Sequence, residues 1–179
     1  QAEQMYQRAI DADPTNANIL ASYADFLENI RGDMDQAQQM YQQATEVDPH
    51  HAAILGAYAL FLHTVRGDMD QAQQMYQQAI TADPTNANIF GAYANFLGAY
   101  AIFLETVRGD MDQAEQMYQR AINADPNHAA ILGAYADFLE NIRGDMDQAQ
   151  QMYQQATDAD PNHAAILGAY ALFLHTVRG

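Results

Sequence analysis

The sequence has no cysteine, no lysine and only one serine, Ser22, in 179 residues. Without cysteine the chain cannot form disulfides, zinc–thiolate sites or a cysteine nucleophile, although this composition is compatible with any cellular compartment. No apolar run reaches the roughly 18 residues that a membrane-spanning helix needs. The first residues, QAEQMYQRAI, lack the basic and then apolar layout of a secretory signal. We therefore expect no membrane partner, and the sequence indicates no targeting segment.

Positive charge is also scarce. The chain carries 23 acidic residues and seven basic ones, all arginine, for a formal net charge of -16. Nucleic acid is a poor partner because a phosphate backbone is held by clustered basic side chains, and anionic membranes are disfavoured for the same reason. A basic protein segment would be attracted, although a solvated surface that keeps the chain soluble explains the charge equally well.

Residues for catalysis or metal binding are not arranged in any recognised pattern. The six histidines lack the H-x-x-x-H or E-x-x-H spacing that places ligands on one helix face. The sequence also has no glycine-rich phosphate loop. We predict a protein that is not an enzyme, with no catalytic residue, metal or cofactor. The histidines are His50, His51, His63, His128, His163 and His175.

Internal repeats dominate what is present. The tripeptide RGD begins at Arg31, Arg66, Arg108 and Arg143, and RG occurs again at Arg178, which gives successive spacings of 35, 42, 35 and 35. A longer period also exists, because residues 1–67 match residues 113–179 with only nine differences. The offset between these two matching segments equals the sum of three consecutive RGD spacings. Such periods are typical of helical repeat arrays.

Each repeat contains two segments with helical periodicity. In residues 68–84, apolar side chains recur every three or four positions and glutamines occupy the other face, as in an amphipathic helix. In residues 52–67 the apolar arc is wider, so this helix should be buried over more of its circumference. We call the helix of residues 52–67 and its equivalents the first helices, and the helix of residues 68–84 and its equivalents the second helices.

The helix boundaries are predicted from three residue types. Gly67 can adopt the left-handed conformation after a first helix, Asp68 can cap the second helix, and Pro84 follows its end. The recurring RGD is therefore explained by helix termination and capping. An integrin-type adhesion motif is the alternative interpretation of the same tripeptide.

These residues resemble the tetratricopeptide repeat: L-x-x-Y-A-x-x-L on the first helix, then A-x-x-x-Y-x-x-A and a closing DP on the second. Both repeat lengths exceed the roughly 34 residues that are usual for this family. The resemblance implies an all-α solenoid of helical hairpins, with about ten antiparallel helices wound as a right-handed superhelix. The matching packing residues are Leu55, Tyr58, Ala59, Leu62, Ala72, Tyr76, Ala79 and Pro84.

We predict a single repeat array over residues 1–179. Small residues such as Ala59 and Ala72 should let paired helices approach closely, and Tyr76 should fill the space between successive hairpins. The predicted hairpins are 15–49, 50–84, 85–126 and 127–161, with half repeats at 1–14 and 162–179 and a longer unit at 1–112 that recurs in part at 113–179.

The resemblance implies that first helices line a concave groove that binds protein or peptide. Exposed positions on these helices vary between copies, so that acidic pairs alternate with leucine and histidine pairs. This pattern favours a scaffold that binds an extended segment with basic and apolar residues, although neutral drift on a solvated face would also produce it. The expected groove residues are Asp25, Glu28, Leu60, His63, Asn95, Glu105, Asp137, Glu140, Leu172 and His175.

One repeat carries an extra heptad, GAYANFLGAYAIFL in residues 91–104. Seven residues turn an ideal helix by about 700°, which is about 20° short of two turns, so the helix should lengthen and keep its faces. We expect one continuous helix over residues 86–107 and a displacement of the hairpins after Gly109 by about two turns. A kink at Gly98 or a protruding tip is the alternative.

Half repeats at both ends predict an apolar face at each end of the array. The first helix of one copy could be completed by the second helix of another, which gives a head-to-tail contact that builds filaments. The alternative is that the residues belong to a longer covalent array or fibre. The expected contact residues are Met5, Tyr6, Ile10, Ile166, Tyr170, Phe173 and Val177.

Overall fold

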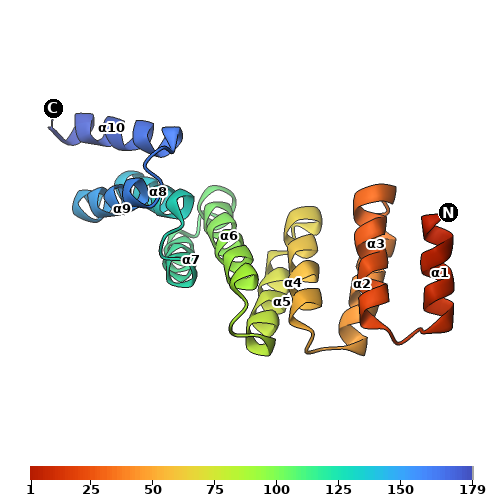
Figure 1. Cartoon of the computed structure of the whole chain (residues 1–179). Helices are drawn as coiled ribbons and strands as arrows, with labels where there is room; N and C mark the ends of the chain where they lie inside the picture. Colours follow the sequence, from red (N-terminus) through yellow and green to blue (C-terminus); the bar gives the residue numbers. More distant parts are fainter. Residues whose placement is uncertain (179) are drawn as a thin grey trace. The chain divides into compact units, whose positions relative to one another are not determined.

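The computed structural model describes residues 1–178, which form ten α-helices and no strand (Figure 1). The prediction of an all-α chain of ten helices is confirmed. Gly179, the last residue of the predicted closing half repeat, lies outside the described residues. The helices are α1 (Ala2–Ala12), α2 (Ala17–Phe26), α3 (Met34–Val47), α4 (Ala52–Phe61), α5 (Met69–Ala82), α6 (Ala87–Phe103), α7 (Met111–Ala124), α8 (Ala129–Phe138), α9 (Met146–Ala159) and α10 (Ala164–Arg178).

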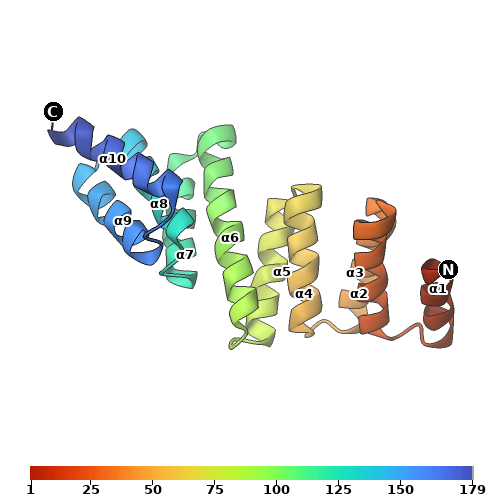
Figure 2. The ribbon, with the colours of Figure 1, turned by 45° about the horizontal axis from the view of Figure 1, so that its top comes forward.

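First and second helices alternate along the chain, and three of the first helices, α2, α4 and α8, pack against the second helix that follows. The pairs α2–α3, α4–α5 and α8–α9 are in contact along their lengths (Figures 1 and 2). The chain divides into two compact units, Gln1–Ala92 and Tyr93–Gly179, and the boundary between them falls inside α6.

The junction between the two helices of a hairpin follows the predicted residues. Gly67 has a φ of 66°, in the left-handed region, and the side chain of Asp68 accepts a hydrogen bond of 3.0 Å from the backbone N–H of Gln71. The same glycine conformation and aspartate cap recur at the three other RGD sequences, at Gly32–Asp33, Gly109–Asp110 and Gly144–Asp145. The glycine and aspartate of RGD are thus used to end one helix and begin the next.

Replacing the cap of α5 tests this role. The variant Asp68→Ala leaves the N–H of Gln71 without its side-chain acceptor and is expected to lower the free energy of unfolding by about 1 kcal/mol. The matched control is Gln74→Ala, an exposed position inside the same helix, where the change should be within about 0.5 kcal/mol. Urea unfolding measures both values, and equal losses in the two variants would contradict the capping role.

First helices end in a turn of π-helix, at η1 (Leu27–Arg31), η2 (Leu62–Arg66), η3 (Leu104–Arg108) and η4 (Leu139–Arg143). Residues 52–66 and 164–178 have the same sequence, yet the first set ends in a π turn and the second is α-helical throughout. In η2 the backbone N–H of Gly67 donates to the carbonyl oxygen of Leu62, the five-residue spacing that defines a π turn, which holds one more residue than an α turn.

The lengthened helix is unbroken, because α6 continues directly into η3 over Ala87–Arg108 (Figure 2). Tyr93, in the first copy of the heptad, accepts a hydrogen bond from the guanidinium of Arg120 on α7. A Cβ atom at Gly98 would lie 3.1 Å from Cγ1 of Ile131, so glycine permits the close approach of α8. The displacement of the later hairpins stays a prediction.

Candidate functional site

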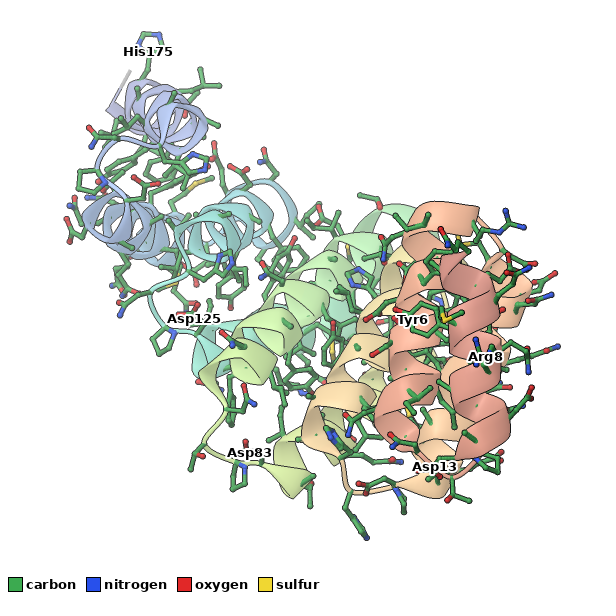
Figure 3. All side chains as sticks on the ribbon, turned by 45° about the vertical axis from the view of Figure 1, so that its right-hand side comes forward. Tyr6, Arg8, Asp13, Asp83, Asp125 and His175 are labelled. Carbon is green, nitrogen blue, oxygen red and sulfur yellow. The ribbon has the colours of Figure 1, made fainter. Side chains whose placement is uncertain are left out.

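The predicted groove residues lie on the first helices in both units. Most are accessible: Asp25, Leu60, Asn95, Asp137, Leu172 and His175 are exposed, and Glu28, His63, Glu105 and Glu140 are half-buried. Figure 3 shows His175 projecting away from α10. Unit 1 contributes the residues of α2, α4 and their π turns, and unit 2 contributes the others.

A buried tyrosine fixes the acidic pair of α2 and η1. The hydroxyl of Tyr41, on α3, donates to Asp25 and lies 3.3 Å from Glu28 Oε2. Its ring packs against the next first helix, with ring centroids 5.6 Å from Tyr58 and 5.4 Å from Phe61. One side chain therefore joins two successive hairpins and orients the carboxylates on the exposed face.

The same arrangement recurs in unit 2. The hydroxyl of Tyr153 donates to Asp137 and lies 3.1 Å from Glu140 Oε2. The hydroxyl of Tyr118 lies 3.2 Å from Glu105 Oε2. Repetition of the sequence thus repeats the contact. The sequence predicted only a packing role for tyrosines at this position, and the constant spacing between glutamate and tyrosine was the signal available for the hydroxyl contact.

Burial and the neighbouring carboxylates change the proton affinities at these pairs. Burial raises the pKa of Glu28, and the charge of Asp25 adds to this, while the hydrogen bond from Tyr41 opposes it. Burial, followed by the hydrogen bonds and charges of the acidic pairs, raises the pKa of Tyr41 and of Tyr153 well above the usual range. The tyrosine hydroxyls therefore stay protonated and act as hydrogen-bond donors.

In other first helices the positions equivalent to the acidic pair hold residues of a different kind. Leu60 and His63 replace the acidic pair in the hairpin of α4 and α5, where burial lowers the pKa of His63. In unit 2, the side-chain oxygen of Asn95 lies 2.7 Å from Nε2 of His128, which begins α8. The exposed face of the first helices therefore alternates between acidic, apolar and neutral polar positions.

Two equivalent hollows lie between successive first helices. In unit 1 a hollow of about 260 Å³ is lined by Gly56, Ala57, Leu60 and Ile89, among others. In unit 2 a hollow of about 200 Å³ is lined by the corresponding residues of α8 and α10, namely Gly133, Ala134, Asp137 and Ile166. Alanine, glycine and isoleucine line both hollows. The two hollows differ at the rim, where Leu60 stands in one and Asp137 in the other.

Arginines of the RGD sequences, at the ends of first helices, hold successive hairpins together by contacting the second helix of the preceding hairpin. The guanidinium of Arg143 donates to the Met111 carbonyl oxygen at 3.2 Å and forms ion pairs of 2.7 Å with both Asp112 and Glu115. Arg66 contacts Met34 and Asp35 in the same way. The arginine also lies over a phenylalanine of its own helix in three of the RGD sequences. Sequence reasoning missed this link, although arginine and aspartate have the same separation along the chain in both pairs.

The residues predicted for end-to-end contact fall into two groups. Ile166 and Phe173 are buried within the chain, Phe173 against Tyr153 with ring centroids 5.3 Å apart. Met5 and Val177 are exposed, and Tyr6, Ile10 and Tyr170 are half-buried. The ring of Tyr6 packs on Tyr23 and Phe26 of α2.

Within residues 1–178, no three His, Cys, Asp or Glu side chains are grouped as a metal site would require. Across the same residues, none of the helices combines the length and apolar character needed to cross a bilayer.

Two family models match parts of the chain. A model described as tetratricopeptide repeat matches residues 108–173, and one described as TmcB, TPR repeats, matches residues 1–50 and 34–89. The chain belongs to the tetratricopeptide-repeat family. The resemblance predicted from the packing residues is confirmed. Comparison with curated proteins gives no match for this tetratricopeptide chain.

Solved tetratricopeptide structures share the fold. YrrB, whose structure is described as a TPR protein with an unusual peptide-binding site, has a TM-score of 0.65 and 21% identity, over 97% of this chain and 84% of YrrB. MamA has a TM-score of 0.68 and 18% identity, over 92% of this chain and 90% of MamA. PilW, a type IV pilus biogenesis factor, has a TM-score of 0.61 and 20% identity, over 97% of this chain and 81% of PilW.

Proposed function

We propose that this chain is a non-enzymatic scaffold that binds an extended protein segment on the exposed face of its first helices. The tetratricopeptide fold supports protein interaction in general, and YrrB has a peptide-binding site by its description. The bound segment would carry basic and apolar side chains. The observation that carries this proposal is the pairing of tyrosine-held carboxylates with apolar hollows on the same face.

The carboxylates supply charge in fixed positions. Since Tyr41 and Tyr153 hold Asp25 and Asp137, these acids need not be ordered when a basic residue arrives, and less conformational entropy is lost on binding. Each tyrosine hydroxyl occupies part of the acceptor capacity of its carboxylate, which has about four lone-pair sites. The remaining acceptor sites can bind a lysine or arginine of the segment.

The hollows supply the apolar part of the surface. Their linings of alanine, glycine and isoleucine leave space for an aliphatic side chain, and covering such a surface removes apolar area from water. Asp137 stands at the rim of one hollow and Leu60 at the rim of the other. The two hollows should therefore prefer segments in which different residues flank the bound aliphatic side chain. An extended segment presents alternate side chains to one surface and fits this arrangement.

Neutralising the acidic pairs tests the proposal. Peptides that bind the intact chain would first be selected from a displayed random library. Their affinity for the chain would then be measured by fluorescence anisotropy. In the variant Asp25→Asn, Glu28→Gln, Asp137→Asn, Glu140→Gln, amide oxygens can still accept from the tyrosines, so the fold should be kept. Binding is expected to weaken about fourfold or more and to lose most of its salt dependence, since exposed charge pairs each contribute about 0.2–1 kcal/mol.

The chain offers a control with the same change in net charge. The variant Asp11→Asn, Glu46→Gln, Asp147→Asn, Asp158→Asn alters four exposed acids on second helices. It should bind the selected peptides within about twofold of the original chain. Equal weakening in both variants, or a change below twofold in the first, would show that net charge or another surface governs binding.

A further inference from the structure

Helices α1 and α10 each lack, among the described residues, the hairpin partner that other helices of their type have. The chain contains an internal reference for both. Residues 164–178 of α10 repeat the sequence of residues 52–66, which pair with α5, and residues 2–10 of α1 repeat the sequence of residues 114–122 in α7. Because the compared segments have the same sequence, any difference in the exposed fraction of their side chains is caused by the helices that lie next to them.

On α10 the comparison identifies an uncovered stripe. Leu55 is 1% exposed beside α5, whereas the equivalent Leu167 is 43% exposed. The same change occurs at every third or fourth residue along this side of the helix, so it marks the face that a second helix covers. The residues of this face, named here the tail face, are Leu167, Ala171, Leu174 and Val177, and their counterparts are Leu55, Ala59, Leu62 and Val65.

On α1 the complementary face is uncovered. Met117 is 8% exposed in α7, whereas the equivalent Met5 is 51% exposed. Tyr118 is buried and Tyr6 is half-buried. The residues of this face, named here the head face, are Ala2, Met5, Tyr6 and Ala9, and their counterparts are Ala114, Met117, Tyr118 and Ala121.

One contact recurs where such faces meet inside the chain. In three hairpins, a leucine of the first helix packs with a methionine and an alanine of the second helix. The sets are Leu20, Met40 and Ala44, then Leu55, Met75 and Ala79, and then Leu132, Met152 and Ala156. The equivalent leucine at the tail face is Leu167, and the equivalent methionine and alanine at the head face are Met5 and Ala9.

We propose that a second copy of this chain docks its head face on the tail face, so that α10 of one copy and α1 of the next form an intermolecular hairpin. Leu167 then packs with Met5 and Ala9 of the second copy. Ile166 and Phe173 keep their contacts within the chain and take no part. Because each copy has one head face and one tail face, and the two differ, the contact is heterologous and association can proceed beyond a dimer.

Net charge gives this association a characteristic salt dependence. Two copies that each carry a formal charge of -16 repel each other. The docking faces are apolar, so salt screens the repulsion without weakening the contact. Self-association should therefore strengthen as salt is added, whereas an association through arginine–carboxylate pairs would weaken.

Complementation between two variants tests the proposal on the whole chain. Leu167→Glu blocks the tail face and Met5→Glu blocks the head face, since each would bury an unpaired charge in the contact. Sedimentation velocity should show concentration-dependent assembly of the original chain and at least about tenfold weaker self-association of each variant. An equimolar mixture of the two variants should form a one-to-one heterodimer through the intact head face of one and the intact tail face of the other.

A leucine on the same helix serves as the control. Leu172 is 63% exposed, and its counterpart Leu60 remains exposed although α4 is paired with α5, so Leu172→Glu should assemble like the original chain. Circular dichroism should give the same helicity for all variants. An original chain that stays monomeric at all concentrations and salt levels, or a mixture that forms no heterodimer, would overturn the proposal and leave the tail face to another partner helix.

Discussion

Raising the pH above 10 is expected to unfold this chain cooperatively. Tyr41, Tyr76, Tyr118 and Tyr153 are buried on second helices, and burial raises the pKa of each, in the case of Tyr76 to about 12. Unfolded tyrosines ionise near pH 10. The stability contributed by keeping these phenols protonated is fully present below pH 10 and is lost as the pH rises toward the folded-state values.

The expected loss is large because four tyrosines act together. Each contributes a slope of about 1.4 kcal/mol per pH unit, so the free energy of unfolding should fall by about 5 kcal/mol per pH unit above pH 10. Far-ultraviolet circular dichroism and tyrosinate absorption, followed in one titration, should change together. The variant Tyr153→Phe removes one of the four ionising groups and should lower the slope of the free energy of unfolding by about 1.4 kcal/mol per pH unit. A gradual rise of tyrosinate absorption with helicity intact would contradict this prediction.

Truncation of Phe138 should have the largest effect of any single substitution considered for this chain. Phe138 is 1% exposed, lies 5.5 Å from Tyr118 and 6.3 Å from Tyr135 between ring centroids, and supports the guanidinium of Arg143. Phe138→Ala removes the ring that joins two hairpins and leaves a cavity. We expect the free energy of unfolding to fall by about 3–5 kcal/mol in urea titrations.

Phe103 is the matched control for this truncation. It occupies the equivalent position before an RGD sequence and lies under Arg108, but it is half-buried because Phe96, one heptad earlier, occupies the buried position. Phe103→Ala should therefore cost clearly less than Phe138→Ala. If both variants lost a similar free energy of unfolding, Phe96 would not have taken over the stabilising buried position from Phe103.

Much of the fold follows from the sequence because each element is coded locally and then repeated. Gly67 and Asp68 ended and began helices as predicted, since a left-handed glycine and an aspartate cap depend only on nearby backbone groups. The heptad lengthened α6 without a break for the same reason. The helical periodicity of two segments in each repeat predicted alternating helices, and the ten helices of the structure confirm this.

Other features depend on contacts between elements, which no local pattern specifies. The donation from Tyr41 to Asp25 joins residues on different helices, and Arg143 reaches Asp112 in the preceding hairpin. Residues 52–66 end in a π turn at Leu62–Arg66, whereas the identical residues 164–178 are α-helical, so the sequence of this segment alone does not specify the turn. The burial of Phe173 likewise comes from Tyr153 on another helix. Sequence reasoning predicted the exposed positions of the first helices but not the tyrosines that hold them.

The most direct test of binding on the first helices is to locate a selected peptide on the intact chain. Backbone amide chemical shifts would be recorded by NMR while the peptide is added to saturation. We expect the changes to concentrate on α2, α4 and α8 and on the rims of the two hollows, near Leu60 and Asp137. Changes confined to the second helices α3, α5 and α9 would contradict the proposed binding face.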